Sequence, residues 1–345
     1  MSSKKSRITL SVIALLIILM ASGAFWAWNL FTSPTFLKGE QAHLYISSGS
    51  TSSQVLATMD TLASPMKIKA LKAILDLRHY DQNVRSGHYV IDSSSSVLDV
   101  FRKLSRGEQT PVKVTIRPAR TLQAVSNDLG RQLMADSTDI LKVLTDSEWP
   151  KSLGLDESQS FSTVIPDTYE MYWNISVEKL CDRLSQEYNR FWKSKEEKVK
   201  ALGLSPSEIS VLASIVEEET QSSKEKPVVA GLYLNRLHRG MPLQADPTVL
   251  FGMGLLGKAH RVTNEYLRHE SPFNTYLHQG LPPSPIRIPS KEGLEAVLDY
   301  AHHDYLYMCA KEDFSGTHNF ARTLSEHNRN ADRYRAALNQ RKIYN

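Results

Sequence analysis

The sequence predicts an α+β protein with an N-terminal transmembrane helix, a small module of strand–helix units, and a mainly helical domain that contains a short β element. Three observations carry this prediction. An apolar run without charges lies near the N-terminus, a strand-to-helix pattern recurs over residues 38–134, and helical periodicity dominates residues 135–345. A chain of 345 residues is long enough for two ordinary domains beyond a targeting segment.

The N-terminal run favours a membrane anchor. Residues 8–31 carry no charge and would form a helix about 36 Å long, enough for a hydrocarbon core of about 30 Å. Residues 1–7, "MSSKKSR", are basic and are predicted to form a cytoplasmic tail, so the rest of the chain should lie outside the cytoplasm. The alternative is a cleaved signal peptide with Ser22–Ala24 as the small-residue site.

The module at residues 38–134 shows one pattern three times. Strand chemistry passes through a serine, threonine or proline turn into a helical period in "HLYISSGSTSSQVLATM", "GHYVIDSSSSVLDVFRKL" and "VKVTIRPARTLQAVSNDL". We therefore expect three strand–helix units in one small domain. The pattern alone is typical of ligand-binding modules and of plain spacers, and does not choose between them.

The remaining chain is mainly helical. An amphipathic helix or helix pair is expected within 177–202, a helix begins at Ser205–Pro206, and another ends near Gly240. A long stretch rich in proline, glycine and asparagine follows, where binding residues are often found. The chain closes with an expected strand at "YLYMCA", a turn and a charged C-terminal helix.

Composition excludes several classes of function. The chain has 41% apolar and 23% charged residues and a net charge of +4, as globular proteins do. Its basic residues form no stripe with interleaved aromatics, so we expect no nucleic-acid partner. Cys181 and Cys309 form no CxxC motif, and we expect two ordinary buried thiols; one long-range disulfide stays open.

The segment "LASIVEEETQSS" contains three consecutive glutamates, whose positions around a predicted helix can be compared on a helical wheel. At ~100° per residue, Glu219 falls within the apolar stripe that begins at Leu212, whereas Glu217 and Glu218 fall outside it. We therefore expect Glu217 and Glu218 on a solvated face. A metal cage is not expected, because no HExxH motif or comparable ligand spacing surrounds them; we predict no metal and no cofactor.

The position of Glu219 has a chemical consequence. A carboxyl group among apolar side chains resists ionisation, so its pKa rises. Such a group stays protonated near neutral pH and can donate a proton to a leaving oxygen, which is what cleavage of a glycosidic bond requires. The alternative is a structural glutamate at the edge of the core, paired with an arginine or a backbone amide.

Several blocks of the sequence carry a resemblance to a known family. The blocks, in order, are "VIPDTYEMYW", "LASIVEEET", "VAGLYLNRLHRGMPLQADPTVLFGMG", "SPFNTYLHQGLPPSPI" and "YLYMCAKEDFSGTHNFARTLSEHNRN". Together they resemble the endolytic murein transglycosylases, the MltG/YceG-like family. The resemblance implies a LysM-like module at 38–134 and a lysozyme-like catalytic domain at 135–345, on the periplasmic side of the cell inner membrane. One departure is Ser284, where the family usually has glycine.

The resemblance also implies an activity. The family's catalytic glutamate directly precedes a threonine, which here gives Glu219 followed by Thr220. The implied substrate is the nascent glycan strand of peptidoglycan, cut between MurNAc and GlcNAc without water. Glu219 would act as acid and then as base while the MurNAc C6 hydroxyl attacks C1, giving a 1,6-anhydro-MurNAc end and terminating elongation. Two alternatives stay open: a hydrolytic muramidase, and a non-catalytic peptidoglycan-binding partner of the synthesis machinery.

Further site residues are expected in the matching blocks. Amide, carboxylate and phenol groups suited to a sugar site belong to Gln244, Asp246, Asn274 and Tyr276, with turn chemistry or core packing as alternatives. Support is expected from Thr220, Asn235 and Arg236, the last two either holding the glutamate helix or forming a plain salt bridge. His318 and His327 either line the site or are structural. Peptidoglycan synthases are implied as further partners.

Overall fold

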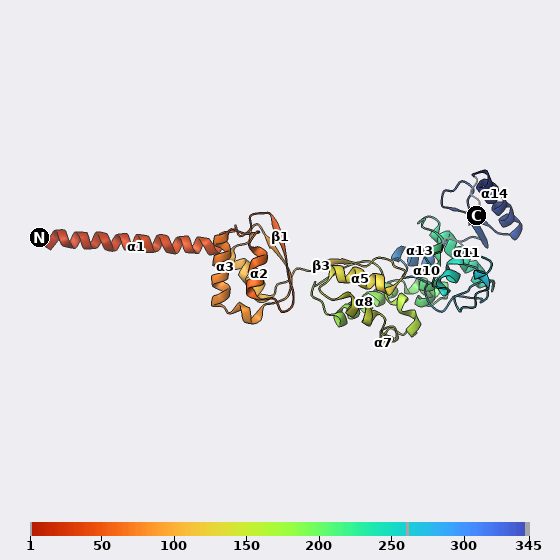
Figure 1. Cartoon of the computed structure of the whole chain (residues 1–345), viewed down its shortest axis with the longest axis horizontal. Coiled ribbons are helices and arrows are strands. Elements are labelled where there is room, and N and C mark those ends of the chain that lie inside the picture. Colours follow the sequence, from red (N-terminus) through yellow and green to blue (C-terminus); the bar gives the residue numbers. More distant parts are fainter. Residues whose placement is uncertain (1, 260–261, 342–345) are drawn as a thin grey trace. The chain divides into compact units, whose positions relative to one another are not determined.

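The computed structural model describes residues 2–259 and 262–341, without the side chains of residues 2–7 (Figure 1). Contacts divide the chain into two compact units. The first unit runs to Lys113 and includes Glu170–Ile175, and the second contains Val114–Tyr169 and Ser176 onward. Helices and short strands occur together in the chain, so the expected α+β class is confirmed.

The first unit begins with a long apolar helix, α1 (Ser2–Thr32). Its segment Ile8–Thr32 contains an 18-residue window with a mean hydropathy of 2.5 that is not buried by the rest of the chain, so the segment is long and apolar enough to span a membrane. The expected tail at residues 1–7 is part of this helix from Ser2 onward, while Met1 lies outside the described residues.

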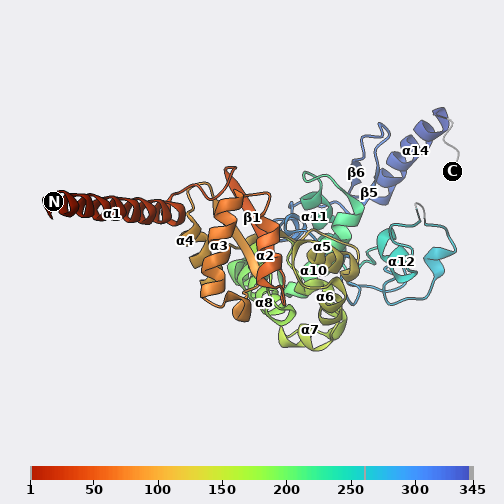
Figure 2. The ribbon, with the colours of Figure 1, turned by 60° about the vertical axis from the view of Figure 1, so that its left-hand side comes forward.

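A small two-layer module follows α1 (Figure 2). Strands β1 (Gln41–Ile46) and β2 (Gly87–Asp92) pair antiparallel, from Gln41↔Asp92 to Ile46↔Gly87. The helical elements that complete the module are α2 (Ser52–Met59), α3 (Pro65–Leu77), the 3-10 turn η1 (Tyr80–Asn83) and α4 (Val97–Arg106).

The first two expected strand–helix units are confirmed in this module. Thr51 and Ser96 each form a capping box at the start of the following helix, which satisfies backbone N–H groups that the helix leaves unpaired. The alternating burial of β1 directs Leu44 and Ile46 into an apolar core beneath the helices. The serine and threonine clusters therefore act as predicted, as helix starts.

The third strand–helix unit lies elsewhere than expected. We expected the module to extend to residue 134, but the first unit ends at Lys113. Strand β3 (Val112–Thr115) pairs with β4 (Thr168–Met171), and α5 (Leu122–Gln132) packs against α6 (Ser137–Leu144). Sequence likeness predicted the local shape of this unit correctly, but its packing partners come from downstream in the chain.

The second unit is mainly helical, as expected. After α6 it contains the short helices α7 (Glu148–Ser152) and η2 (Glu157–Thr163), the helix pair α8 (Val177–Ser194) and α9 (Glu196–Leu202), then α10 (Pro206–Glu219), α11 (Lys226–His238), α12 (Asp246–Gly252), η3 (Tyr266–Arg268) and α13 (Lys291–Leu298). A hairpin of β5 (Tyr307–Ala310) and β6 (His318–Ala321) precedes α14 (Leu324–Gln340), which packs on it.

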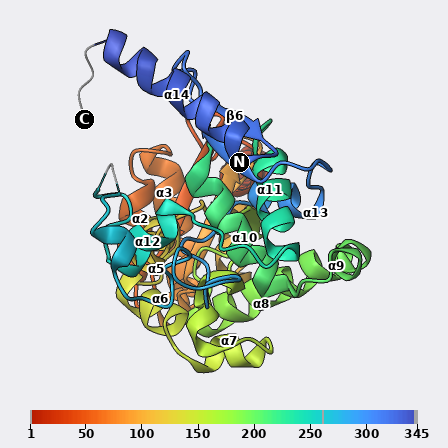
Figure 3. The same cartoon turned by 90° about the vertical axis from the view of Figure 1, so that its right-hand side faces the viewer.

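Helix α10 is the central helix of this unit (Figure 3). It packs against α11, α12 and α13, and nearly every residue from Ser207 to Glu217 is buried. A capping box at Ser205 and a proline at the first turn begin the helix, and the extended backbone of Thr220 (φ −143°) ends it. Glu219 therefore stands at the C-terminal end of a buried helix.

The two cysteines are free thiols, Cys181 buried and Cys309 half-buried. No disulfide joins them; the expected burial is correct for Cys181, whereas Cys309 is only partly buried.

Candidate active site

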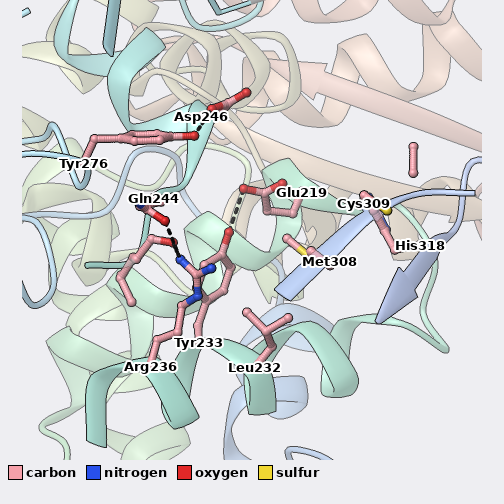
Figure 4. A pocket seen from close by; sticks show the side chains of 12 residues that line it. Glu219, Leu232, Tyr233, Arg236, Gln244, Asp246, Tyr276, Met308, Cys309 and His318 are labelled. Atoms are coloured by element: carbon pink, nitrogen blue, oxygen red, sulfur yellow. Dashed lines mark hydrogen bonds between the residues drawn. The ribbon is translucent and has the colours of Figure 1, made fainter. Parts of the chain in front are cut away.

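Glu219 lies in a cavity of about 240 Å³ in the second unit (Figure 4). The end of α10, one face of α11, the loop before α12 and the β5–β6 hairpin form its walls. The lining residues are Glu219, Leu232, Tyr233, Arg236, Leu243, Gln244, Asp246, Tyr276, Met308, Cys309, Ala310 and His318. Carboxylate, phenol, amide and imidazole groups thus face one space that is large enough for a small polar ligand.

A phenol holds the Glu219 carboxyl. The Tyr233 hydroxyl on α11 donates a hydrogen bond of 2.7 Å to Oε1 of Glu219 (Figure 4). Tyr233 is fully buried, and burial together with the nearby carboxyl raises its pKa well above the ordinary value. The phenol therefore keeps its proton at physiological pH and remains a donor to Glu219.

Burial changes the protonation of Glu219 itself. The residue stays in contact with solvent through the cavity, yet protein atoms surround the carboxyl so closely that desolvation raises its pKa from 4.5 to about 7. The bond from Tyr233 opposes this rise, the charges of Asp246 and Glu218 add to it, and Arg236 opposes it. A large fraction of the Glu219 side chains is therefore protonated at neutral pH.

Three of the four expected sugar-binding residues line the same cavity. Gln244, Asp246 and Tyr276 form its wall opposite Glu219, and the Tyr276 hydroxyl donates a 2.6 Å bond to Oδ1 of Asp246 (Figure 4). Gln244 has a left-handed backbone (φ 52°), which is unusual for a residue with a side chain and marks a strained position at the site. Its N–H donates to the Thr275 carbonyl, 3.1 Å away.

Asn274, the fourth expected residue, lies outside the cavity lining. Its side chain is fully buried and donates to the carbonyls of Leu267 (3.0 Å) and His269 (2.8 Å). Its Oδ1 accepts the N–H of Tyr276 at 3.0 Å. Asn274 therefore shapes the loop that presents Tyr276. This role corresponds to turn chemistry, the alternative that the sequence left open for Asn274.

Asn235 and Arg236 support the cavity walls rather than the glutamate helix. Arg236 is buried and donates to the carbonyls of Leu306 (2.6 Å) and Leu243 (2.9 Å) and to the Gln244 amide oxygen (3.2 Å). The Asn235 amide donates to backbone carbonyls in the segment 303–305. These contacts show neither a hold on α10 nor a plain salt bridge, because the acceptors are backbone oxygens of two loops and the uncharged Gln244 side chain.

The prediction for Glu217 and Glu218 is wrong. Both side chains are only 5% exposed. Glu218 accepts two bonds from Arg120 (2.8 and 2.9 Å) and one from Arg287 (3.1 Å). Glu217 accepts from both the N–H and the hydroxyl of Ser290. The helical wheel assumed a solvent-facing side, whereas protein surrounds α10, so each charge must be paired.

The sequence comparison decides the family. A sequence model of the YceG-like family matches residues 44–333, most of the chain. The chain belongs to the YceG-like family. It is 26% identical over 288 residues to an endolytic murein transglycosylase of Streptococcus pneumoniae, covering 74% of this chain and 52% of that protein. It is 33% identical over 166 residues to an endolytic murein transglycosylase of Bacillus subtilis, covering 48% and 45%. The chain thus spans about half the length of these curated relatives.

A solved structure supports the fold. The crystal structure of a YceG-like protein from Listeria monocytogenes matches with a TM-score of 0.54 and 24% identity, covering 84% of this chain and 99% of that one. At this identity the likeness concerns the fold.

Sequence reasoning missed a buried carboxylate beside the site of this YceG-like chain. Glu225 accepts the Thr220 hydroxyl (3.1 Å), the backbone N–H of His318 (2.7 Å) and Nδ1 of His318 (3.1 Å). Thr220, which was expected to support the site, does so through its hydrogen bond to Glu225. Glu225 in turn holds His318, which lines the cavity. A lone glutamate after "TQSSK" gave no periodic signal, because its partner is a strand residue far along the chain.

His327 and His303 lie outside the cavity lining. His327 stacks on Tyr307, with ring centroids 5.5 Å apart, and burial lowers its pKa. His303 contacts the Val228 carbonyl through Nε2 (2.9 Å). Within residues 2–259 and 262–341, no group of three or more His, Cys, Asp or Glu side chains is arranged to hold a metal ion.

Proposed function

We propose that this protein is an endolytic peptidoglycan lytic transglycosylase, a lyase that cuts nascent glycan strands between MurNAc and GlcNAc. The observation that carries the proposal is a carboxyl with a pKa of about 7, held by a buried phenol in an accessible polar cavity. Membership of the YceG-like family and likeness to two proteins named endolytic murein transglycosylase support the same activity.

The chemistry needs one group that gives and then takes a proton. Protonated Glu219 donates its proton to the bridging oxygen as the bond from C1 of MurNAc to that oxygen breaks. The carboxylate formed then takes the proton of the MurNAc C6 hydroxyl, whose oxygen bonds to C1 and closes the 1,6-anhydro ring. The attacking hydroxyl belongs to the substrate, so its effective concentration is high and no water is consumed.

The surrounding side chains have separate roles in this proposal. Tyr233 orients the Glu219 carboxyl and stabilises its anionic form between the two proton transfers. Gln244 and Asp246 are exposed at the cavity and, with Tyr276, offer hydrogen bonds to sugar hydroxyl and acetamido groups. Arg236 and Asn235 keep these walls in place through their backbone contacts.

Hydrolysis is the second candidate, and Asp246 is the observation that favours it. Hydrolytic glycosidases use two carboxylates across the scissile bond, and Asp246 is a second carboxylate in the same cavity. One oxygen of Asp246 is engaged by Tyr276, which leaves the other to position a water. A muramidase of this kind would release reducing MurNAc ends instead of anhydro ends.

Product analysis separates the candidates. The purified full chain, its Glu219→Gln variant and a Glu197→Gln control are incubated with peptidoglycan sacculi, and the released fragments are analysed by mass spectrometry. Glu197 is a suitable control because its side chain is 91% exposed. Anhydro ends from the wild type and control, with none from Glu219→Gln, are expected. Reducing ends would support the muramidase, and cleavage by Glu219→Gln at the wild-type rate would refute the assignment of the acid.

The placement of the activity is also a proposal. Helix α1 anchors the chain once in the cell inner membrane, with the second unit as the lysozyme-like catalytic domain on the periplasmic side and the first unit as a LysM-like module that contacts glycan. Peptidoglycan synthases are the proposed partners, since a cut in a growing strand terminates its elongation. Protease treatment of spheroplasts tests the topology: both units should be digested from outside, and protection would refute the assigned side.

A further inference from the structure

An apolar groove lies where the membrane helix meets the module. Within the first unit, a cavity of about 430 Å³ is lined by one face of α1, by α3 and by α4. Its lining residues are Ala24, Ala27, Trp28, Phe31, Thr32, Ala73, Ile74, Leu77 and Leu98. Apart from Thr32 these side chains are all apolar, so the groove has few groups with which water can bond.

Helix α3 is apolar on two faces. One face, with Leu71 and Leu75, is buried in the core of the module. The other carries Met66 and Leu77, which are 53% and 74% exposed. The core of the module is already formed by the opposite face of α3, so folding alone does not require a second apolar stripe. The exposed stripe therefore indicates a further apolar contact.

The position of the exposed α3 face along the axis of α1 indicates what this face contacts. A membrane core needs about 20 residues of helix, so a span that starts at Ile8 leaves the core near Ala27. The groove is lined by α1 residues on both sides of that point, and Trp28, an interfacial residue type, is one of them. The exposed face of α3 therefore lies at the depth where acyl chains meet head groups.

Hydrogen bonds between α1 and α3 fix the position of α3 along the axis of α1. The Lys67 side chain is buried and donates to the Leu30 carbonyl (2.9 Å) and to the Ser33 hydroxyl (2.6 Å). A cation bound at the C-terminal carbonyls is a favourable helix cap, and it ties α3 to the last turn of α1. The membrane helix therefore continues into the module without a free linker.

Cationic side chains flank the exposed face. Lys69 lies one turn before Ala73, and Arg78 follows Leu77; both are exposed. Long basic side chains beside an apolar stripe extend towards lipid phosphates, and each is attracted to an anionic surface. Charge and apolar surface together match a phospholipid leaflet.

We propose that the groove formed by Trp28 of α1 and Ile74 and Leu77 of α3 is filled by phospholipid acyl chains, so that α3 lies partly in the leaflet in which α1 ends. The inference rests on the proposed membrane anchor and is independent of the chemistry at Glu219. Its consequence is that the module is laid on the bilayer surface rather than held away from it.

Spin labels in the full chain test the contact. In a Cys181→Ala, Cys309→Ala background, single cysteines replace Leu77, Leu16 in the span, and Ala57, an exposed residue of α2. The chains are reconstituted one per nanodisc in phosphatidylethanolamine and phosphatidylglycerol. Collision rates with oxygen, which concentrates in lipid, and with a water-soluble nickel chelate are then measured.

The expected oxygen-to-nickel ratio is several-fold higher at Leu77 than at Ala57, and close to that at Leu16. A water-exposed label at Leu77 with a lipid-exposed label at Leu16 would overturn the groove contact and leave the anchor standing. Water exposure at both would refute the anchor and the contact with it. Shielding of Leu77 that appears only with two chains per disc would assign the groove to a second copy and overturn the lipid as occupant.

Discussion

The Glu219→Gln substitution is expected to stabilise the folded chain at alkaline pH while it abolishes cleavage. The Glu219 carboxyl ionises near pH 7 in the folded chain and near 4.5 when unfolded. Between these values the folded state keeps a proton that the unfolded state has lost. Stability from the neutral acid is therefore complete below pH 4.5 and is lost as the pH rises through 7. Glutamine does not ionise, so the variant escapes this loss.

The magnitude follows from the two pKa values. A rise from 4.5 to about 7 corresponds to about 3.4 kcal/mol, and about three quarters of it falls between pH 5 and 8.5. The cavity leaves Glu219 partly exposed, so solvent screening reduces the expected effect by about half, to ~1.3 kcal/mol. For a unit of this size, that free energy raises the midpoint of thermal unfolding by roughly 3 to 5 °C.

The assay is thermal unfolding of the detergent-solubilised full chain at pH 5 and pH 8.5. The quantity compared is the difference in midpoint between Glu219→Gln and wild type at each pH. This difference should grow by the stated amount at pH 8.5, and the Glu197→Gln control should show no such growth. A difference that stays the same at both pH values would refute the argument that burial keeps Glu219 neutral.

Further predictions concern the neighbours of the acid. Tyr233→Phe removes the hydrogen bond that favours the Glu219 carboxylate, so the pKa of Glu219 should rise. Because a charge-assisted bond exceeds a neutral one by about 1 kcal/mol, the alkaline limb of the pH profile of kcat/KM should move up by about one pH unit. An unmoved limb would contradict this reasoning. Glu218→Ala leaves two arginines without their shared acceptor and should lower the free energy of unfolding by about 3 kcal/mol, against less than about 0.5 kcal/mol for Glu197→Ala, measured by urea unfolding. Glu225→Gln weakens the hold on the cavity histidine, so it should raise KM or lower kcat several-fold with unchanged circular dichroism; wild-type kinetics would leave the pair without a role in the site. Chelation with EDTA should leave cleavage unchanged, and loss of activity restored by a divalent ion would contradict a metal-free mechanism.

How far the sequence predicts the site depends on whether a residue's partners are local. Glu219 could be placed because the apolar stripe and the helix end lie within a few residues of it. Glu217 and Glu218 could not, since their partners Arg120 and Arg287 come from distant segments that only the fold brings to α10. A helical wheel gives the angular position of each side chain around the helix. It does not show whether other parts of the protein bury every side of that helix.

The same distinction explains the fold. Strand, cap and helix of each repeat were predictable because turns and capping boxes are local. The unit to which α5 belongs was not predictable, because pairing of β3 with β4 depends on a strand about fifty residues downstream. Tyr233 is a related case: its phenol sits in an apolar helical run, and only the packing of α11 on α10 brings it to Glu219.

Direct titration of the Glu219 carboxyl tests the central claim most closely. The full chain carrying ¹³C-labelled glutamate is followed by NMR from pH 4 to 9, and the Glu219 signal is identified by its absence in Glu219→Gln. The account predicts a midpoint near pH 7 for this one carbon. A midpoint near 4.5 would show a carboxylate already ionised at neutral pH, with no proton to give to a leaving sugar.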